Sequence, residues 1–192
     1  ADQGRQKSAT FSEAIRYVIR LRNVWILCLA TAGVSGCVNG LLGYLPIHLR
    51  GLGWAPALAD STLASFHAIS MILAIPIALL SDRLGNRRGV LMASALIIGI
   101  GTGLVGISSG LMISLSVLLA GFARDGFMAI TMTAAIEVKG VGARFAGTAT
   151  GLMMSVMGFV TLFAPPTGNW LARFGSGFPF FFWAALVISG AL

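Results

Sequence analysis

Two opposite charges stand next to each other near the midpoint of a long apolar run, Arg124 and Asp125 within residues 111–138. A guanidinium at the centre of a bilayer costs about 2.5 kcal/mol or more, so Arg124 must face protein, water or a counter-charge. It is therefore a candidate for binding an anion or coupling ion movement, the alternative being a structural ion pair. Neighbouring side chains on one continuous helix point about 100° apart, so we expect Arg124 and Asp125 not to pair with each other.

Asp125 and three other polar side chains inside the apolar runs are further candidates for substrate binding or proton coupling. Asp125 could take up and release a proton if its carboxyl lines a cavity, or it could serve as a buried structural partner. Asn39 and Tyr44 could offer hydrogen bonds to a substrate, although a mid-span asparagine also joins helices to one another. His67 could relay a proton or be hydrogen-bonded between helices.

The elements that carry these side chains are predicted to cross a membrane. The chain has 192 residues, of which 57% are hydrophobic and 10% charged, and its mean hydropathy is +0.90. A soluble domain of this length could not bury so much apolar surface. A helix needs roughly 20 apolar residues to cross a hydrocarbon core. We therefore expect an all-α membrane protein whose six-helix transmembrane bundle has spans at about residues 24–45, 56–80, 90–107, 111–138, 145–163 and 179–192.

Prolines set several predicted limits of these spans. Pro46 is expected to end the first span and to open an outer loop over residues 46–55, while Pro56 suits the first turn of the second span. Pro165 and Pro166 are expected to stop the fifth span. The last apolar run would be about 21 Å long as a helix, too short to cross. We therefore expect a last helix that is truncated, or a chain that continues beyond this sequence.

Residues 1–23 are predicted to form a cytoplasmic linker and an interfacial amphipathic helix, apart from the transmembrane bundle over residues 24–192. Apolar residues recur at helical spacing in this segment, while Arg16, Arg20 and Arg22 take the other side. This pattern is typical of a helix in the headgroup layer whose arginines reach anionic lipid. An ordinary extension of the first span is the alternative.

Charge and cysteine content narrow the function classes further. The net charge is +7, but the basic residues lie beside apolar runs with few aromatics among them, so we do not expect nucleic-acid binding. Cys28 and Cys37 both fall inside the first apolar run, where cysteine behaves as a small hydrophobe. They indicate neither a disulfide nor a metal site, and no cofactor is expected.

The Lys and Arg residues predict the orientation, because cytoplasmic loops carry an excess of them. One side holds only Arg50 and Arg173. The other holds Arg5, Lys7, Arg16, Arg20, Arg22, Arg83, Arg87, Arg88, Lys139 and Arg144. The amino terminus is therefore predicted to be cytoplasmic.

Residues 78–88 form a charged segment between two apolar runs, reading Ala-Leu-Leu-Ser-Asp-Arg-Leu-Gly-Asn-Arg-Arg. We expect a tight turn at the membrane surface, with Asp82 accepting hydrogen bonds at the amino-terminal end of the fifth span near Arg144. Arg83, Arg87, Glu137 and Arg144 are candidates for ion pairs at this surface. The alternative for the arginines is that membrane topology alone places them there.

This segment resembles the signature turn of the major facilitator superfamily, Gly-x-Leu-x-Asp-Arg-x-Gly-Arg-Arg, which joins the second and third helices of each six-helix half. The matching positions are Leu80, Asp82, Arg83, Gly85 and Arg87. Ala78 replaces the first glycine and Asn86 the first of the paired basic residues. The stretch from Gly158 to Gly168 is similar to the end of the fifth helix of such a half, and the polar leader resembles the linker between halves.

The resemblance implies the carboxy-terminal half of a twelve-helix secondary active transporter that works by alternating access about a site near the midplane. It would carry a small solute across the cytoplasmic membrane. Because residues 137–151 are similar to members that carry anions, an anion is one candidate, with a proton as the candidate coupling ion. Its partners would be the lipid bilayer and the amino-terminal half of the same transporter, and it would not be an enzyme. The cytoplasmic gating residues would be Asp82, Arg83, Gly85, Arg87, Glu137 and Arg144, which would lock the outward-facing state.

Two alternatives come from other classes. The sequence Gly33-Val34-Ser35-Gly36 matches the Gly-x-Ser-Gly of rhomboid-type intramembrane proteases, with His67 on the next span as a candidate base. That family separates its serine and histidine by a further helix, however, and the Asp82 turn would stay unexplained. The other alternative is a non-transporting membrane module, against which the midplane charges argue.

Overall fold

The chain folds into an all-α bundle. The computed structural model describes residues 11–138 and 140–191. Within them lie α1 (Phe11–Ile19), α2 (Arg22–Gly51), α3 (Pro56–Leu84), α4 (Arg87–Val105), α5 (Leu111–Phe122), α6 (Arg124–Glu137), α7 (Gly142–Leu171), the short 3-10 helix η1 (Ala172–Phe174) and α8 (Phe178–Ala191). These residues contain no strand, and the prediction of an all-α membrane bundle is confirmed.

Five helical segments of the described chain are long and apolar enough to cross a membrane. They are Arg22–Gly51, Pro56–Leu84, Arg87–Val105, Leu111–Glu137 and Arg144–Phe174. The sixth predicted span corresponds to α8, which is apolar but has 14 residues. The amphipathic helix predicted before the first span corresponds in sequence to α1, a separate helix that ends at Ile19, before α2 begins at Arg22.

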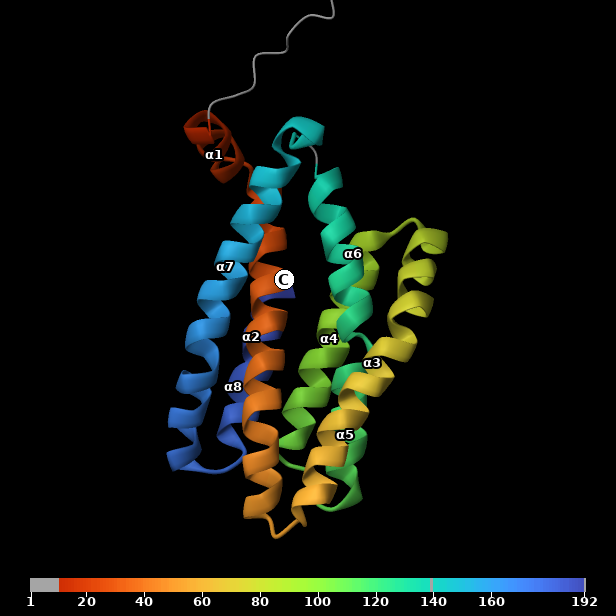
Figure 1. Cartoon of the computed structure of the whole chain (residues 1–192), viewed down its shortest axis with the longest axis vertical. Helices are drawn as coiled ribbons and strands as arrows, with labels where there is room; N and C mark the ends of the chain where they lie inside the picture. Colours follow the sequence, from red (N-terminus) through yellow and green to blue (C-terminus); the bar gives the residue numbers. More distant parts are fainter. Residues whose placement is uncertain (1–10, 139, 192) are drawn as a thin grey trace, which may run out of the picture.

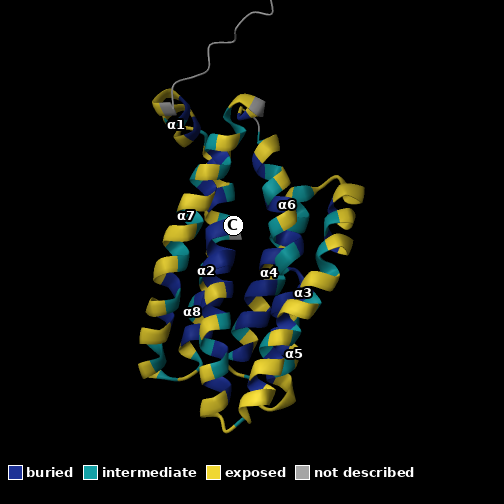
Figure 2. Cartoon of the chain, viewed as in Figure 1, coloured by how far each residue is buried: buried dark blue, intermediate teal, exposed yellow. Residues whose placement is uncertain are grey.

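Helix α2 runs through the middle of the bundle. Figure 1 shows α7 on one flank of α2, α6 and α3 on the other, and α8, α4 and α5 farther from the viewer. Helix α2 packs mainly on α7 and α8, α3 on α5 and α6, and α4 on α5 and α8. The most apolar window of α2 is 56% buried, against 17% for α3 and 11% for α7. Figure 2 shows the same contrast, so α3 and α7 offer most of their surface to lipid or to another protein surface.

The two ends of the bundle differ in charge. The basic end, as we call it, carries Arg16, Arg20, Arg22, Arg83, Arg87, Arg88 and Arg144. The opposite end carries Arg50 and Arg173, near the α2–α3 and α7–α8 connections.

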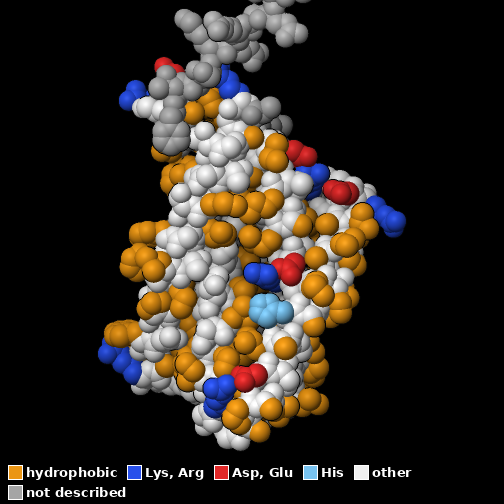
Figure 3. Space-filling model, viewed as in Figure 1, with side chains coloured by type: hydrophobic (Ala, Val, Ile, Leu, Met, Phe, Trp, Pro, Cys, Tyr) orange, Lys and Arg blue, Asp and Glu red, His pale blue; other side chains and the backbone are white. Residues whose placement is uncertain are grey.

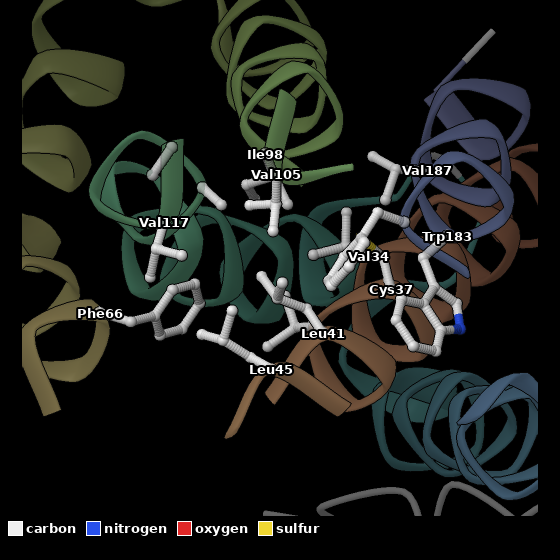
Figure 4. Packing of buried hydrophobic residues seen from close by; sticks show 14 of the residues in the cluster. Val34, Cys37, Leu41, Leu45, Phe66, Ile98, Val105, Val117, Trp183 and Val187 are labelled. Atoms are coloured by element: carbon white, nitrogen blue, oxygen red, sulfur yellow. The ribbon is translucent and has the colours of Figure 1, made fainter. Parts of the chain in front are cut away.

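A continuous apolar core joins helices α2 to α8. Figure 4 shows side chains from α2, α3, α4, α5 and α8 meeting around Leu41 and Leu45 of α2. Phe66 of α3 enters this core from one side and Trp183 of α8 from the other, and both are fully buried. The mid-parts of these helices are therefore fixed relative to one another.

Trp183 joins three helices in a slot formed by two glycines. A Cβ atom added at Gly40 of α2 would lie 2.2 Å from Trp183 Cε2, and one added at Gly168 of α7 would lie 2.3 Å from the same atom. The indole Nε1 donates a hydrogen bond of 2.9 Å to the carbonyl of Ala164 in α7. Only glycine allows the indole to lie against both backbones.

Three prolines do not end the helices that the sequence predicts them to end. Helix α2 continues through Pro46 to Gly51, and α7 continues through Pro165 and Pro166 to Leu171. Proline removes the backbone donor to the carbonyl four residues before it, in α7 the carbonyls of Thr161 and Leu162, and membrane helices tolerate such losses where the surrounding structure compensates. The next two carbonyls of α7 accept side-chain hydrogen bonds, Phe163 from the Thr167 hydroxyl at 2.8 Å and Ala164 from the Trp183 indole. The predicted loop over 46–55 thus shrinks to residues 52–55.

Candidate functional site

The fourth predicted span is broken at its centre. Ala123 has φ −109° and ψ 0° and lies between the end of α5 and the start of α6. The first backbone amides of α6 therefore lack partners within their own helix. The Asp125 amide donates instead to the hydroxyl of Ser70 on α3, at 3.1 Å. Helix α6 thus begins inside the apolar segment, with Ser70 supporting its first turn.

Arg124 and Asp125 form an ion pair at this break, which contradicts the expectation that they would not pair. That expectation assumed a continuous helix, whereas Arg124 is the first residue of a new one. The two side chains are 33% and 29% exposed, so neither is sealed in the core. The positive end of the α6 dipole also favours the carboxylate of Asp125. The pair is neutral as a unit, but it remains accessible from one face.

His67 lies close to this pair through α3. It precedes Ser70 by three residues, so the two side chains lie on the same face of α3, one turn apart. His67 is exposed, and its ring meets the Phe66 ring edge-on at 5.5 Å. Within the described residues it forms no hydrogen bond, so the interhelical hydrogen bond considered as an alternative is absent there. Figure 3 shows a basic group, an acidic group and a histidine side by side halfway along this face, among apolar side chains.

Asn39 and Tyr44 lie elsewhere on α2. The Asn39 amide donates to the Ser35 carbonyl of its own helix at 2.8 Å, and its side chain is exposed. Tyr44 belongs to an aromatic group with His48, Phe180 and Trp183, at centroid distances of 6.0, 5.7 and 6.0 Å. Asn39 therefore remains available to a ligand on an exposed face, while Tyr44 packs against α8.

A second polar group ties three helix ends together at the basic end. Arg87, the first residue of α4, pairs with Glu137 at the end of α6 and with Asp82 in the last turn of α3, the latter at 3.3 Å. Gly85 turns the chain between α3 and α4 with φ +60°, a left-handed conformation that glycine adopts without strain. The Asn86 side chain accepts a hydrogen bond of 3.0 Å from the Gly89 amide and caps α4.

The expected contact between Asp82 and the amino-terminal end of α7 is wrong for this chain. Helices α3 and α7 do not pack against each other in the described residues, because α2 and α6 lie between them (Figure 1). Arg144 lies over the Phe145 ring at 5.3 Å. Arg83 is exposed on the last turn of α3.

Two polar residues escaped the sequence reasoning. Ser70 resembles any small residue of an apolar span, and only its place opposite the α6 break reveals its role. Asn86 did carry a signal, since asparagine directly before an Arg-Arg-Gly helix start is a preferred capping residue.

Neither a metal-ligand cluster nor the serine–histidine pair of a rhomboid-type protease is assembled in the described residues. No three His, Cys, Asp or Glu side chains lie close enough there to hold a metal ion. Ser35 is buried on α2 while His67 is exposed on α3, and no hydrogen bond joins them in this part of the chain.

The chain matches a known protein family. The family model described as Major Facilitator Superfamily matches residues 27–192. The match begins within α2 and covers all the later helices, so only α1 and the first residues of α2 lie outside it. No curated protein matches the chain.

Proposed function

Because this chain belongs to the major facilitator superfamily, we propose that it is the carboxy-terminal half of a secondary active transporter that works by alternating access. The family membership directly supports a membrane transporter, whereas the carboxy-terminal half and the alternating-access mechanism are proposals. The other wall of the transport pathway would come from the amino-terminal half, and the neutral and apolar surfaces of α3 and α7 would adjoin lipid or that half. We propose a cytoplasmic amino terminus in the plasma membrane, supported by the arginines of the basic end.

The observation that carries this proposal is Arg124 at the start of a helix that begins inside the membrane-spanning segment. Transporters of several folds place the positive ends of such broken helices at anionic substrate groups near the midplane. Arg124 adds a fixed positive charge at the same point. We propose that an anionic substrate binds Arg124 there and takes the place that Asp125 holds in the substrate-free pair.

Charge balance supports coupling to a proton. The Arg124–Asp125 pair sums to zero, and a bound anion would leave one uncompensated negative charge at the bilayer centre, which is costly. One proton on the Asp125 carboxyl would restore the neutral sum. His67, one turn from Ser70 on the exposed face of α3, is the proposed route by which that proton reaches the site, and Asn39 is a proposed hydrogen-bond donor to the substrate.

The polar group at the basic end supports a gating role. Asp82, Arg87 and Glu137 join the ends of α3, α4 and α6, so these helices would move as one body when the halves rock. Gly85 allows the tight turn that brings Arg87 back to Asp82. Arg83 and Arg144 are the proposed contacts to the other half in the outward-facing state.

The test is ligand-dependent thermal stabilisation of the full transporter, screened with small inorganic and organic anions, sugars, amino acids and cationic drugs. We expect stabilisation by an anion that Arg124→Ala removes. The double variant Arg124→Ala/Asp125→Ala keeps the site neutral and should fold yet fail to bind. Arg88→Ala is the control, because this arginine is exposed at the basic end and has no proposed role in binding or gating. Stabilisation by a neutral or cationic compound that survives both Arg124 variants would contradict the proposed site.

A non-transporting membrane module is the second candidate, and the same screen tests it. Such a module would respond to none of the compounds. When proteoliposomes that contain such a module are given any of the anions, no proton movement across their membranes should be detected.

A further inference from the structure

Helix α1 lies across one end of α7 at the basic end of the bundle (Figure 1). Val18 of α1 is fully buried and Ala14 is 6% exposed, so one face of this short helix is packed. The Tyr17 and Phe145 rings stack with their centroids 4.8 Å apart and fix α1 to the first turns of α7. The contact leaves a groove between the two helices.

The groove has a volume of about 270 Å³. Its walls are Ile15, Val18 and Ile19 of α1 and Gly147, Thr148, Gly151, Leu152 and Ser155 of α7. A Cβ atom added at Gly147 or Gly151 would meet nothing within 4 Å, so the glycines keep the floor open rather than seating a neighbouring helix of this chain. The groove extends for about 12 Å along α7, a length that fits within the hydrocarbon layer of one leaflet.

The mouth of the groove is basic. A second hollow on α1 is lined by Ser12, Ile15, Arg16, Ile19 and Arg20, and it shares Ile15 and Ile19 with the groove. Arg16 lies in α1 and Arg20 directly follows its last residue, and both are exposed and line this same hollow. In the described part of the chain neither forms an ion pair. Two positive charges therefore stand where an apolar slot opens to the membrane surface.

We propose that this groove is a binding site for one anionic phospholipid. The phosphate binds Arg16 and Arg20, and one acyl chain lies in the slot between α1 and α7. A charged head joined to a long apolar tail is the chemistry that matches a basic mouth on an apolar slot. The bound lipid bridges α1 to the first turns of α7, and it thereby ties the amino-terminal linker to a membrane-spanning helix.

The experiment measures lipid retained by the full protein in detergent, using native mass spectrometry and titration with phosphatidylglycerol, phosphatidylcholine and glycerol phosphate. We expect phosphatidylglycerol to bind in preference to phosphatidylcholine, and glycerol phosphate not to compete, because it lacks the acyl chain. Arg16→Gln/Arg20→Gln should weaken phosphatidylglycerol binding by about 30-fold, which is roughly fivefold for each arginine. Arg22→Gln, which lines neither hollow, is the matched control and should bind within about twofold of wild type.

A second variant tests the slot without touching the arginines. Gly151→Leu fills the floor, where nothing within 4 Å opposes it, and should abolish lipid retention while the protein stays folded. Gly158→Leu places the same side chain at an equally open position of α7 beyond the groove and should retain the lipid. Unchanged phosphatidylglycerol binding in either the double arginine variant or Gly151→Leu would overturn the proposal. Cross-linking of the Gly151→Cys variant to another part of the protein would overturn it too, because the groove would then be a protein interface.

Discussion

Gly40→Ala should destabilise the protein, because the added methyl group enters the space of the Trp183 indole. The new Cβ would lie 2.2 Å from Cε2, 2.4 Å from Nε1 and 2.6 Å from Cδ2 of that ring. Carbon atoms in contact normally stand about 3.5–4 Å apart. The ring is 0% exposed and hydrogen-bonded to the Ala164 carbonyl, so it cannot turn away without losing that bond.

The magnitude follows from three effects. Overpacking of a core costs about 1–3 kcal/mol, and loss of the indole hydrogen bond costs about 1 kcal/mol. The better helix propensity of alanine returns about 1 kcal/mol. We therefore expect a net loss of about 2 kcal/mol in the free energy of unfolding, which corresponds to a melting temperature lower by roughly 4–8 °C for a domain of this size.

The assay is thermal unfolding of the full protein, followed with a thiol-reactive fluorophore. Cys28 and Cys37 are 1% and 0% exposed, so they become labelled as the bundle opens. Gly43→Ala is the matched control on the same helix, since nothing lies within 4 Å of its added Cβ, and it should melt at or above the wild-type temperature.

A double-mutant cycle separates the clash from other causes. In a Trp183→Leu background the Gly40→Ala change should cost less than in the wild type, because the ring that it strikes is gone. The reasoning is refuted if Gly40→Ala melts like Gly43→Ala, or if its cost is the same with and without Trp183.

Three further predictions concern the polar groups. Asn86→Ala should lower the unfolding free energy by about 0.5–2 kcal/mol while Asn86→Asp keeps the α4 cap and stability; equal melting of the two variants would argue against the cap. Arg124→Ala should destabilise more than Arg124→Ala/Asp125→Ala, because the single variant leaves a charge unpaired within the bundle, and the reverse order in chemical unfolding would argue against the ion pair. Glu137→Gln should lower the unfolding free energy by less than about 1 kcal/mol, because Glu137 is 60% and Arg87 31% exposed. The same change should alter the rate of interconversion between transport states in a single-molecule distance assay, and an unchanged rate would count against gating.

The sequence by itself determined the class of this protein and most of its helices. An apolar fraction of 57% leaves lipid as the main solvent, and runs of about 20 apolar residues can satisfy their backbone groups in lipid only as helices. The spacing of Asp82, Arg83, Gly85 and Arg87 indicated the family, which the match over residues 27–192 confirms. These features are local in the chain, so no knowledge of neighbouring helices was needed.

Only the tertiary structure decided what the prolines and the central charges do. Pro165 and Pro166 stay within α7, which packs against α8 there through the Trp183 indole and its hydrogen bond to the Ala164 carbonyl. Likewise, the amides freed at the Ala123 break are tolerated because Ser70 of α3 lies opposite them, 55 residues away along the chain. The pairing of Arg124 with Asp125 depends on that break. Each of these outcomes rests on which helices meet, and helix packing is set by the whole folded bundle rather than by local sequence.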